Sequence, residues 1–327
     1  MNYLRHKMGG YDFWYKQKES KDGLYIEICG LESDHECRNV VIPEEINGSP
    51  VREISEDAFF NCGSIETVTL PEGLTMIGAS AFKRCICLTD INFPDSLITI
   101  GDSAFFCCDL RMANFGYNLK TIDASAFANN QNLKNVKFQE KLKIINEFAF
   151  ENCGIVSMTL PDSLTHLDFS AFDGCEDIES LHIGAGLDTD GYDRTIGGVY
   201  CCPSKITVSE KNENFKIINK CLYDMRIKEL VRIPSHADVI IIPKWVESIT
   251  PECFNGIYPD KVIVKCKNLE YIAESYIENA KTVYCIPDSS VEKFLKESGT
   301  NYDYVQSSIS TFLNNISEEK IDKEVLL

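Results

Sequence analysis

Cysteine has the widest chemical repertoire of the residues in this chain, and there are fifteen of them. A thiolate binds zinc, attacks as a nucleophile or forms a disulfide. No Cys-x-x-Cys sequence occurs, and the adjacent cysteines Cys107-Cys108 and Cys201-Cys202 chelate a single metal ion badly. We therefore expect no metal site, and so much free thiol favours a reducing compartment or an anaerobic source.

Five of the cysteines recur at one position, three residues after a phenylalanine, and Asn130 takes that place in another copy. A thiol in such a place fills a corner as a small apolar group with a weak hydrogen-bond donor. Stacking would bring neighbouring thiols near disulfide distance, but parallel side chains give poor geometry. We therefore expect buried structural thiols at Cys62, Cys85, Cys108, Cys153 and Cys175.

Other catalytic chemistry has no support in the motifs. The chain has no glycine-rich phosphate loop, no His-Glu-x-x-His and no Gly-x-Ser-x-Gly sequence. Its five histidines are scattered, although His166 and His182 fall in successive repeats and could approach each other. The carboxylates occupy variable, solvent-facing repeat positions, where a raised pKa is not expected. We predict a protein that is not an enzyme and that has no catalytic residues and no cofactor.

These cysteines belong to a repeat. One hexapeptide pattern returns six times, at steps of 23, 23, 22, 23 and 22 residues. A fixed period in the twenties indicates stacked repeats with one supersecondary unit per period. The six copies are Ile54-Ser-Glu-Asp-Ala-Phe59, Ile77-Gly-Ala-Ser-Ala-Phe82, Ile100-Gly-Asp-Ser-Ala-Phe105, Ile122-Asp-Ala-Ser-Ala-Phe127, Ile145-Asn-Glu-Phe-Ala-Phe150 and Leu167-Asp-Phe-Ser-Ala-Phe172.

Each repeat is predicted to be one coil turn of two short strands. In the unit Leu88–Asp109, Ile91 and Phe93 are two residues apart and share one face of an extended chain, while Asn92 points the other way. Pro94 ends that strand because it cannot donate to a ladder, and Leu97–Ile100 forms the second strand. The fold class is therefore mainly β, an elongated and curved solenoid with short helical or irregular turns. Its six phenylalanines, one per unit of 22–23 residues, should form one buried column.

The pattern Leu-x-x-Ile-x-Leu-Pro, Leu-x-x-Ile, Ala-Phe-x-x-Cys resembles the leucine-rich repeats of the BspA-like (Treponema pallidum-type) family. The six phrases above carry the resemblance, together with Pro71, Pro94 and Pro161 after the first strand. The clear match covers residues 40–185, and a fainter match follows. The resemblance implies a surface or secreted adhesion or binding protein of bacteria, a family also abundant in some protozoan parasites. It implies no catalytic residues.

An outward-facing surface is the candidate functional site. In each first strand the residue between the two buried ones must point outward, and so must the residue two positions earlier. Stacked, they should give two columns on a ribbon about six strands wide. We call these twelve residues the binding ribbon: Thr67, Thr69, Asp90, Asn92, Met112, Asn114, Asn135, Lys137, Ser157, Thr159, Ser180 and His182. The ribbon is polar and nearly free of aromatic rings, so it predicts modest affinity.

The charge of the chain limits its partners. The net charge is −18, and residues 40–185 contain 21 acidic and 9 basic side chains. An acidic surface repels nucleic acid and anionic lipid. There is no run of 18 apolar residues, so no membrane insertion is expected, and Met1–Lys21 lacks the apolar core of a secretory signal. The residues favour the cytoplasm, with a removed signal or another export route as the alternatives, whereas the family resemblance favours the surface.

The sequence pattern divides the chain into six predicted parts. Outside the regular repeats we expect a β-rich cap, an irregular insertion rich in Gly and Asp, degenerate repeats, and a helix from Ser290 to Ser298 that begins with a capping box and ends at Gly299. The predicted parts are residues 1–39 (N-terminal tail and cap), 40–185 (regular repeats), 186–212 (insertion), 213–286 (degenerate repeats), 287–305 (helical C-cap) and 306–327 (amphipathic C-terminal helix).

Three functions stay open. The first is a non-enzymatic protein that presents its sheet face and flanking loops to a protein or peptide, as a bacterial surface or adhesion-type protein does. The second is an intracellular adaptor or structural spacer that acts through its C-terminal helix. The third is an enzyme with its site in the 184–208 insertion or near Cys201-Cys202. The sequence does not settle the oligomeric state, and a monomer is the simpler expectation.

Overall fold

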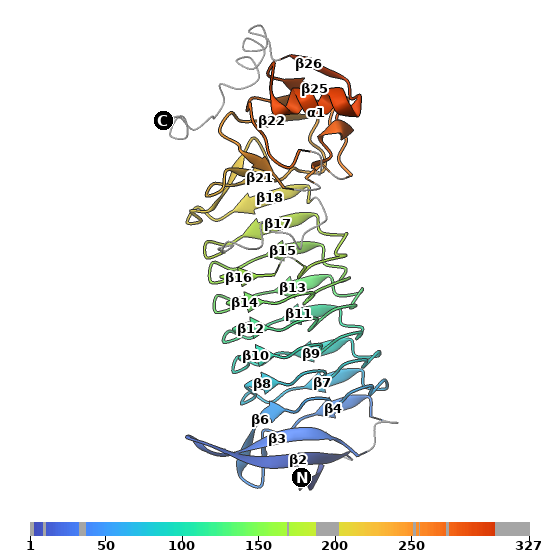
Figure 1. Ribbon diagram of the computed structural model, residues 1–327. Coiled ribbons are helices and arrows are strands. Elements are labelled where there is room, and N and C mark those ends of the chain that lie inside the picture. The colour runs from blue at the N-terminus through green and yellow to red at the C-terminus, as the bar shows by residue number, and fades with distance from the viewer. Residues whose placement is uncertain are drawn as a thin grey trace. The chain divides into compact units, whose positions relative to one another are not determined.

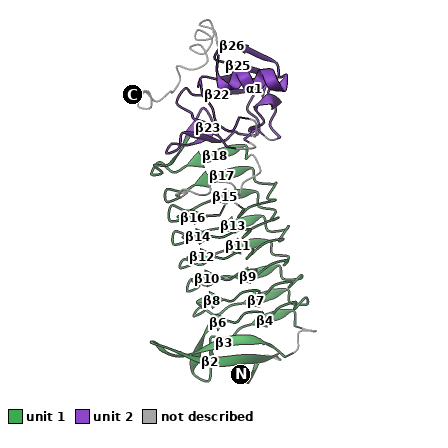
Figure 2. Ribbon diagram, in the orientation of Figure 1, with its two compact units in different colours: residues 1–216 green, residues 217–327 purple. Residues whose placement is uncertain are grey.

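The computed structural model describes residues 3–8, 11–32, 37–168, 170–187, 203–250, 253–254, 256–272 and 275–304. Over these residues the protein is mostly β, with one α-helix. Most of the predicted insertion, the pair Cys201-Cys202 and the predicted C-terminal helix lie outside the described residues. The chain forms two compact units, residues 1–216 and 217–327, which are described separately below (Figure 2).

Unit 1 is a solenoid whose second strands stack in parallel (Figure 1). Successive strands of this ladder come from successive repeats, so the predicted fold class is confirmed. The isoleucine of each of the first five phrases points inward and is fully buried. The strands are β6 (Ser49–Ile54), β8 (Met76–Ile77), β10 (Thr99–Ile100), β12 (Thr121–Ile122), β14 (Ile144–Ile145) and β16 (His166–Leu167).

The first strands of the repeats form two ladders instead of the single face that the sequence suggests. One sheet has the order β4-β7-β9 and the other β11-β13-β15-β17-β18. The strands are β4 (Asn39–Val41), β7 (Thr67–Thr69), β9 (Asp90–Asn92), β11 (Met112–Asn114), β13 (Asn135–Lys137), β15 (Ser157–Thr159), β17 (Ser180–Ile183) and β18 (Lys205–Val208).

The strength of the pairing follows the repeat length. Strands separated by 23 residues, such as β7 and β9, pair over three residues. At the two 22-residue steps the ladder is absent between β9 and β11 and falls to the single pair Asn135–Ser157 between β13 and β15. Both weak junctions precede a strand whose entry corner is one residue shorter, with Asp109 or Gly154 alone between the corner cysteine and the next buried residue.

The predicted phenylalanine column is confirmed. Its six rings are almost completely shielded from water. Adjacent ring centroids lie 4.8 to 5.2 Å apart, and adjacent ring planes differ by at most 12°. A second set of rings, Phe93, Phe115 and Phe138, meets this column edge-on in the central turns. The interior of unit 1 is therefore one continuous apolar stack that no single turn could bury alone.

The corners around the column depend on left-handed backbone. The residue before Ala in the first five phrases has a positive φ, as at Ser80 (54°) and Ser103 (53°). So does the residue before the corner Cys or Asn, as at Asn129 (62°) and Asn152 (53°). Asn adopts this conformation more readily than most residues, and Ser is a common turn residue. The bend lets one turn bond to the next, as when the Phe82 amide donates to the Ala104 carbonyl at 2.7 Å.

An antiparallel sheet covers the first turn. It consists of β1 (Leu4–Met8), β2 (Tyr11–Ser20) and β3 (Gly23–Leu31), and β3 pairs in parallel with β6. Its side chains Phe13, Ile26 and Ile28 are fully buried, so they shield the end of the apolar stack. The short strand β5 (Glu45–Ile46) pairs with β6 across a tight turn.

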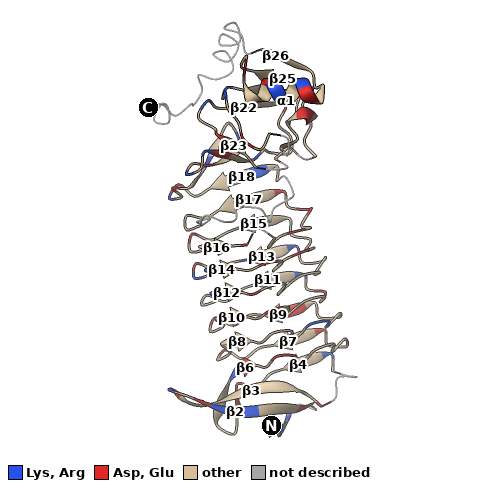
Figure 3. Cartoon of the chain, in the orientation of Figure 1, with Lys and Arg blue, Asp and Glu red and all other residues tan. Residues whose placement is uncertain are grey.

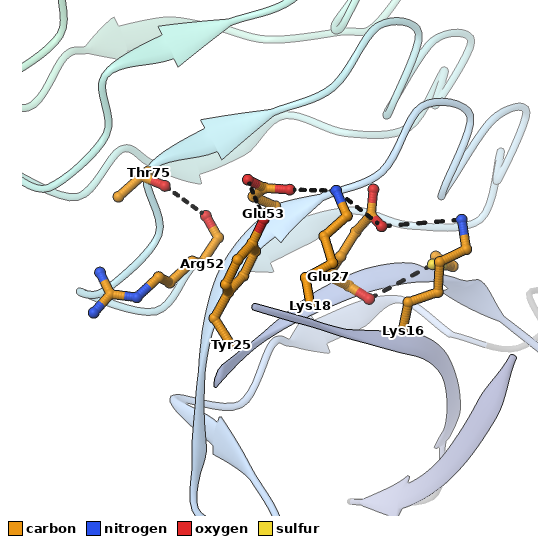
Figure 4. Close-up of polar contacts among 8 residues, drawn as sticks. Lys16, Lys18, Tyr25, Glu27, Arg52, Glu53 and Thr75 are labelled. Carbon is orange, nitrogen blue, oxygen red and sulfur yellow. Dashed lines mark hydrogen bonds and ion pairs between the residues drawn. The ribbon is translucent and has the colours of Figure 1, made fainter. Parts of the chain in front are cut away.

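Charged side chains fix this cap to the first turn (Figure 4). The Lys18 ammonium lies 2.8 Å from Glu53 and 3.3 Å from Glu27, and the Tyr25 hydroxyl donates to Glu53 at 3.1 Å. Partial burial lowers the pKa of Lys18, but the hydrogen bond and the attraction to Glu53 and Glu27 outweigh burial and raise it above its ordinary value. Glu27 is buried, so its carboxylate needs a neighbouring positive charge. Lys18 provides one, and the Lys16 ammonium lies 3.9 Å away.

Unit 2 contains the degenerate repeats. A hairpin of β19 (Phe215–Ile218) and β20 (Cys221–Asp224) continues to β21 (Glu229–Arg232) and β23 (Ser248–Ile249). A second sheet has the order β22 (Val239–Ile242), β24 (Lys261–Val264), β25 (Thr282–Cys285) and β26 (Tyr302–Tyr304). The short 3₁₀ helix η2 (Ile277–Asn279) leads into β25.

The helix α1 (Ser290–Ser298) has the predicted bounds. The Ser289 hydroxyl accepts the Glu292 amide at 3.1 Å, and the Glu292 carboxylate accepts the Asp288 amide at 2.6 Å. Gly299 closes the helix in the left-handed conformation, with φ of 71°. The predicted N-cap and C-terminal glycine are therefore confirmed, and the Glu292 side chain bonds the amide one residue before the N-cap.

Candidate functional site

The twelve ribbon residues lie on the outer face of the first strands. Their neighbours within each strand, such as Val68, Ile91 and Met158, are buried, so alternate residues face solvent. Within each ladder the ribbon residues pair in register, as Thr67 with Asp90, Met112 with Asn135 and Thr159 with His182. The structure thus brings them into two columns, with the break in pairing between β9 and β11 noted above.

Some ribbon side chains hydrogen-bond to the next turn. The Thr67 hydroxyl donates to the Asn39 amide oxygen at 2.7 Å, and the Ser157 and Ser180 hydroxyls lie 2.8 Å apart. The His182 Nδ1 and the Thr207 hydroxyl are 2.9 Å apart. These bonds hold the polar groups in fixed positions on the face, so a partner meets an ordered surface.

The chemistry of the ribbon is that of hydrogen bonding. Asp90 and Lys137 are its only formal charges with histidine neutral, and Met112, 44% exposed, is its large apolar side chain. Amide and hydroxyl groups both donate and accept, so they match the peptide groups and polar side chains of another protein. Such a face can bind another protein through hydrogen bonds.

The columns extend beyond the predicted residues. Asn39 and Val41 of β4 pair with Thr67 and Thr69, and Lys205 and Thr207 of β18 pair with Ser180 and His182. The first extension has a signal in the sequence, because Val40-Val-Ile-Pro43 has the pattern of a first strand. The second has none, since β18 belongs to no copy of the repeated phrase.

The corner cysteines occupy the predicted structural positions. The thiols of Cys85, Cys108 and Cys153 each donate to a phenylalanine carbonyl at 3.2 Å. Burial raises the pKa of Cys108 to about 12 and that of Cys153 well above its ordinary value. Thiols held in this way are poor nucleophiles at neutral pH, and every cysteine in the described part of the chain is free.

Asn130 takes the cysteine position in the fourth unit. Its side-chain nitrogen donates to the carbonyls of Phe105 (2.8 Å) and Phe127 (2.7 Å). Its side-chain oxygen accepts the Leu110 amide at 3.2 Å. One amide thus satisfies three buried backbone groups where a thiol satisfies one.

The two histidines of successive repeats do not form a site. His166 lies in β16, in the sheet of second strands, whereas His182 lies in β17, in the sheet of first strands. Within the described ranges, no group of three or more His, Cys, Asp or Glu side chains is arranged to hold a metal ion. The same residues contain no helix with the length and apolar character needed to span a bilayer.

The comparison with protein families agrees with the repeat geometry. The profile of the BspA type leucine rich repeat region matches residues 52–179 in six copies. These copies coincide with the turns that contain the phenylalanine column. No curated protein sequence matches the chain.

Solved structures show the same fold at low sequence identity. A leucine rich cell surface protein from Faecalibacterium prausnitzii is 15% identical, with a TM-score of 0.54 over 97% of this chain and 98% of its own. The pneumococcal vaccine antigen PcpA is 19% identical, with a TM-score of 0.55 over 81% of this chain and 66% of its own. Repeat pattern, stacked turns and structural relatives agree, and the chain carries a leucine-rich-repeat region of the BspA type at residues 52–179.

Proposed function

We propose that this leucine-rich-repeat protein is a non-enzymatic binding protein that presents the binding ribbon and its flanking loops to a protein or peptide. The observation that carries the proposal is the contrast within each first strand. The inward residues are uniformly apolar, while the outward residues, Met112 apart, are polar, and most of them are exposed. A regular scaffold of this kind positions varied side chains at fixed spacing, which suits recognition of an extended or folded protein surface.

The proposal can be tested with a random peptide library displayed on phage and selected on the full chain. The ribbon variant carries Thr69→Glu, Asn92→Glu and Thr159→Glu, three exposed positions on the first strands. The matched control carries Thr99→Glu, Thr121→Glu and Thr165→Glu on or beside the second strands, so the net charge changes equally.

Support requires selected peptides that lose about tenfold or more in affinity for the ribbon variant and keep their affinity for the control. Peptides that bind both variants equally would place recognition elsewhere and overturn the proposal. So would a selection that yields no specific peptide at all.

We further propose display on the cell surface. One protein with this fold is described as a cell surface protein, and the family resemblance agrees with that location. Biotinylation of intact cells with a reagent that does not cross membranes should label the protein. Labelling only after lysis would favour the adaptor alternative, which acts through residues 306–327, and deletion of those residues should then abolish partner capture.

A further inference from the structure

Positive charge is concentrated in one part of the repeat region. Residues 110–146 contain six basic and two acidic side chains, a net charge of +4, in a chain whose net charge is −18. Six of the nine basic residues of the stretch 40–185 lie here. We call these six residues the cationic patch: Arg111, Lys120, Lys134, Lys137, Lys141 and Lys143.

Stacking of the fourth and fifth turns sets these cations beside one another in two groups, one at the first strands and one at the second strands (Figure 3). Arg111 and Lys134 precede β11 and β13, and the Lys134 amide donates to the Arg111 carbonyl at 3.2 Å. Lys120 and Lys143 precede β12 and β14 and are joined in the same way at 2.9 Å. Lys137 and Lys141 lie between these two pairs along the chain, at the end of β13 and in the corner that follows it.

The positive charges of the patch are not neutralised by ion pairs within the described residues. None of its six cations forms an ion pair with a carboxylate of the described residues, whereas cations elsewhere, such as Lys18 and Lys281, do. Lys141 instead donates to the Asn118 amide oxygen at 2.7 Å and lies 4.5 Å from the centre of the Tyr117 ring. Five of the six side chains are exposed, Lys141 being partly buried.

The two acidic residues of the same stretch offset only part of these charges. Asp123 is half-buried and accepts a hydrogen bond from the Asn146 amide at 2.9 Å. Glu140 is exposed, and the next exposed carboxylate, Glu147, follows β14. The patch therefore presents unpaired positive charge on a molecule that is otherwise acidic, which focuses an attractive field for anions at this place.

We propose that the cationic patch docks an acidic segment of a protein partner, with Asp and Glu carboxylates laid across the fourth and fifth turns. The inference rests on the proposed function and names the chemistry of its partner. Ribbon residues take part in this contact as well. Met112, Asn114 and Asn135 lie on the paired strands β11 and β13, next to Arg111, Lys134 and Lys137. The amides bond peptide groups, Met112 contacts an apolar side chain, and the cations select carboxylates.

The patch spans only two stacked turns, which favours a short protein segment over nucleic acid as its partner. Two stacked turns are about 5 Å apart, and the turns on either side contain Asp90, Asp102 and Asp168. At physiological salt the Debye length is about 8 Å, so carboxylates one turn away still act on a duplex or strand that crosses the patch. A long polyanion is repelled there, while a short acidic segment of a protein is not.

The test measures fluorescence anisotropy of a labelled peptide of alternating Glu and Ala on the full chain, with the Gln-for-Glu peptide as the neutral match. The patch variant carries Arg111→Glu, Lys134→Glu and Lys137→Glu. The control variant carries Lys216→Glu, Lys244→Glu and Lys267→Glu, exposed cations outside the patch, so both variants gain the same negative charge. A single-stranded oligonucleotide of matched charge forms the third arm.

We expect the Glu peptide to bind the natural chain at least about tenfold more tightly than the Gln peptide, with the difference shrinking as salt rises. The patch variant should lose this preference and the control variant should keep most of it. Equal losses in both variants, no preference for Glu, or tighter binding of the oligonucleotide would each overturn the inference. Neutral peptides that depend on the ribbon would overturn it while leaving the proposed function standing.

Discussion

The inner and outer sides of the same turns follow different rules. Inside, the same residue type repeats at every turn, and the rings of Phe82, Phe105 and Phe127 are superposed at nearly constant spacing. Outside, adjacent positions such as Asn114, Lys137 and Thr159 differ in size, polarity and charge. The stack therefore restricts what faces inward and leaves the outward positions free, which is how one scaffold can carry a specific surface.

Removal of one inner ring should have the largest effect on stability. Phe127→Ala should lower the free energy of unfolding by about 3–5 kcal/mol, because it deletes a buried side chain that contacts Phe105 and Phe150. Thr159→Ala, on the outer face, should change stability by less than about 0.5 kcal/mol. Urea denaturation followed by circular dichroism gives both values, and similar losses would contradict the division.

Asn130 tests whether the corner position depends on hydrogen bonds or on volume. Asn130→Ala leaves three buried backbone groups without their partner and should cost about 2–4 kcal/mol. Asn130→Cys should cost clearly less, because a thiol occupies this corner in five other turns. The same urea experiment compares them, and equal costs would show that packing alone sets this position.

The cap provides the next largest effect. Lys18→Met leaves Glu27 and Glu53 without their shared cation, and because Lys18 is partly exposed we expect a loss of about 1–2 kcal/mol. The folded-state pKa of Lys18 is raised, so its stabilisation is complete below the unfolded pKa and is lost as pH rises beyond it.

The difference between Lys18→Met and the natural chain should therefore stay constant from about pH 6 to 9 and shrink above about pH 10.5. Thermal melts across this range measure it. A difference that disappears already at pH 8 would show that the ammonium does not carry the interaction.

The rate of thiol labelling distinguishes inner from outer cysteines without a change in stability. Cys87 is exposed at a corner, whereas Cys108 is buried with a pKa of about 12. With iodoacetamide at pH 8, Cys87 should react within minutes and Cys108 only on unfolding, since its thiolate fraction is about one in ten thousand. Peptide mapping by mass spectrometry separates the two sites, and fast labelling of Cys108 would refute its structural role.

The sequence predicts most of unit 1, for a physical reason. Each position of the column is repeated six times, so the spacing of Phe59 and its equivalents specifies the coil, the strands and the inward face together. The capping box at Ser289 predicts its helix equally well because the signal is local. Where the signal is periodic or local, the residues alone specify the structure.

Other features depend on how neighbouring turns pair, which the residue type at any one position does not predict. The interruption between β9 and β11 comes with the loss of one corner residue, and the pattern of buried residues is unchanged by it. The end strand β18 joins the ribbon by pairing alone. The excess of basic residues in 110–146 can be counted in the sequence, but that Arg111 lies beside Lys134, and Lys120 beside Lys143, follows only from the stacking of two turns.

The alternation of 22- and 23-residue steps has a mechanical consequence. On the ribbon side the first strands form three groups, β4-β7-β9, β11-β13 and β15-β17-β18, separated by the absent ladder at β9–β11 and the single pair at β13–β15. The second strands pair without a break from β6 to β16. Bending should therefore open the ribbon side at the two weak junctions, with the ladder of second strands acting as the hinge. A partner that crosses a weak junction would meet a surface that deforms, whereas one that binds β11 and β13, as the cationic patch does, would meet a stiff surface.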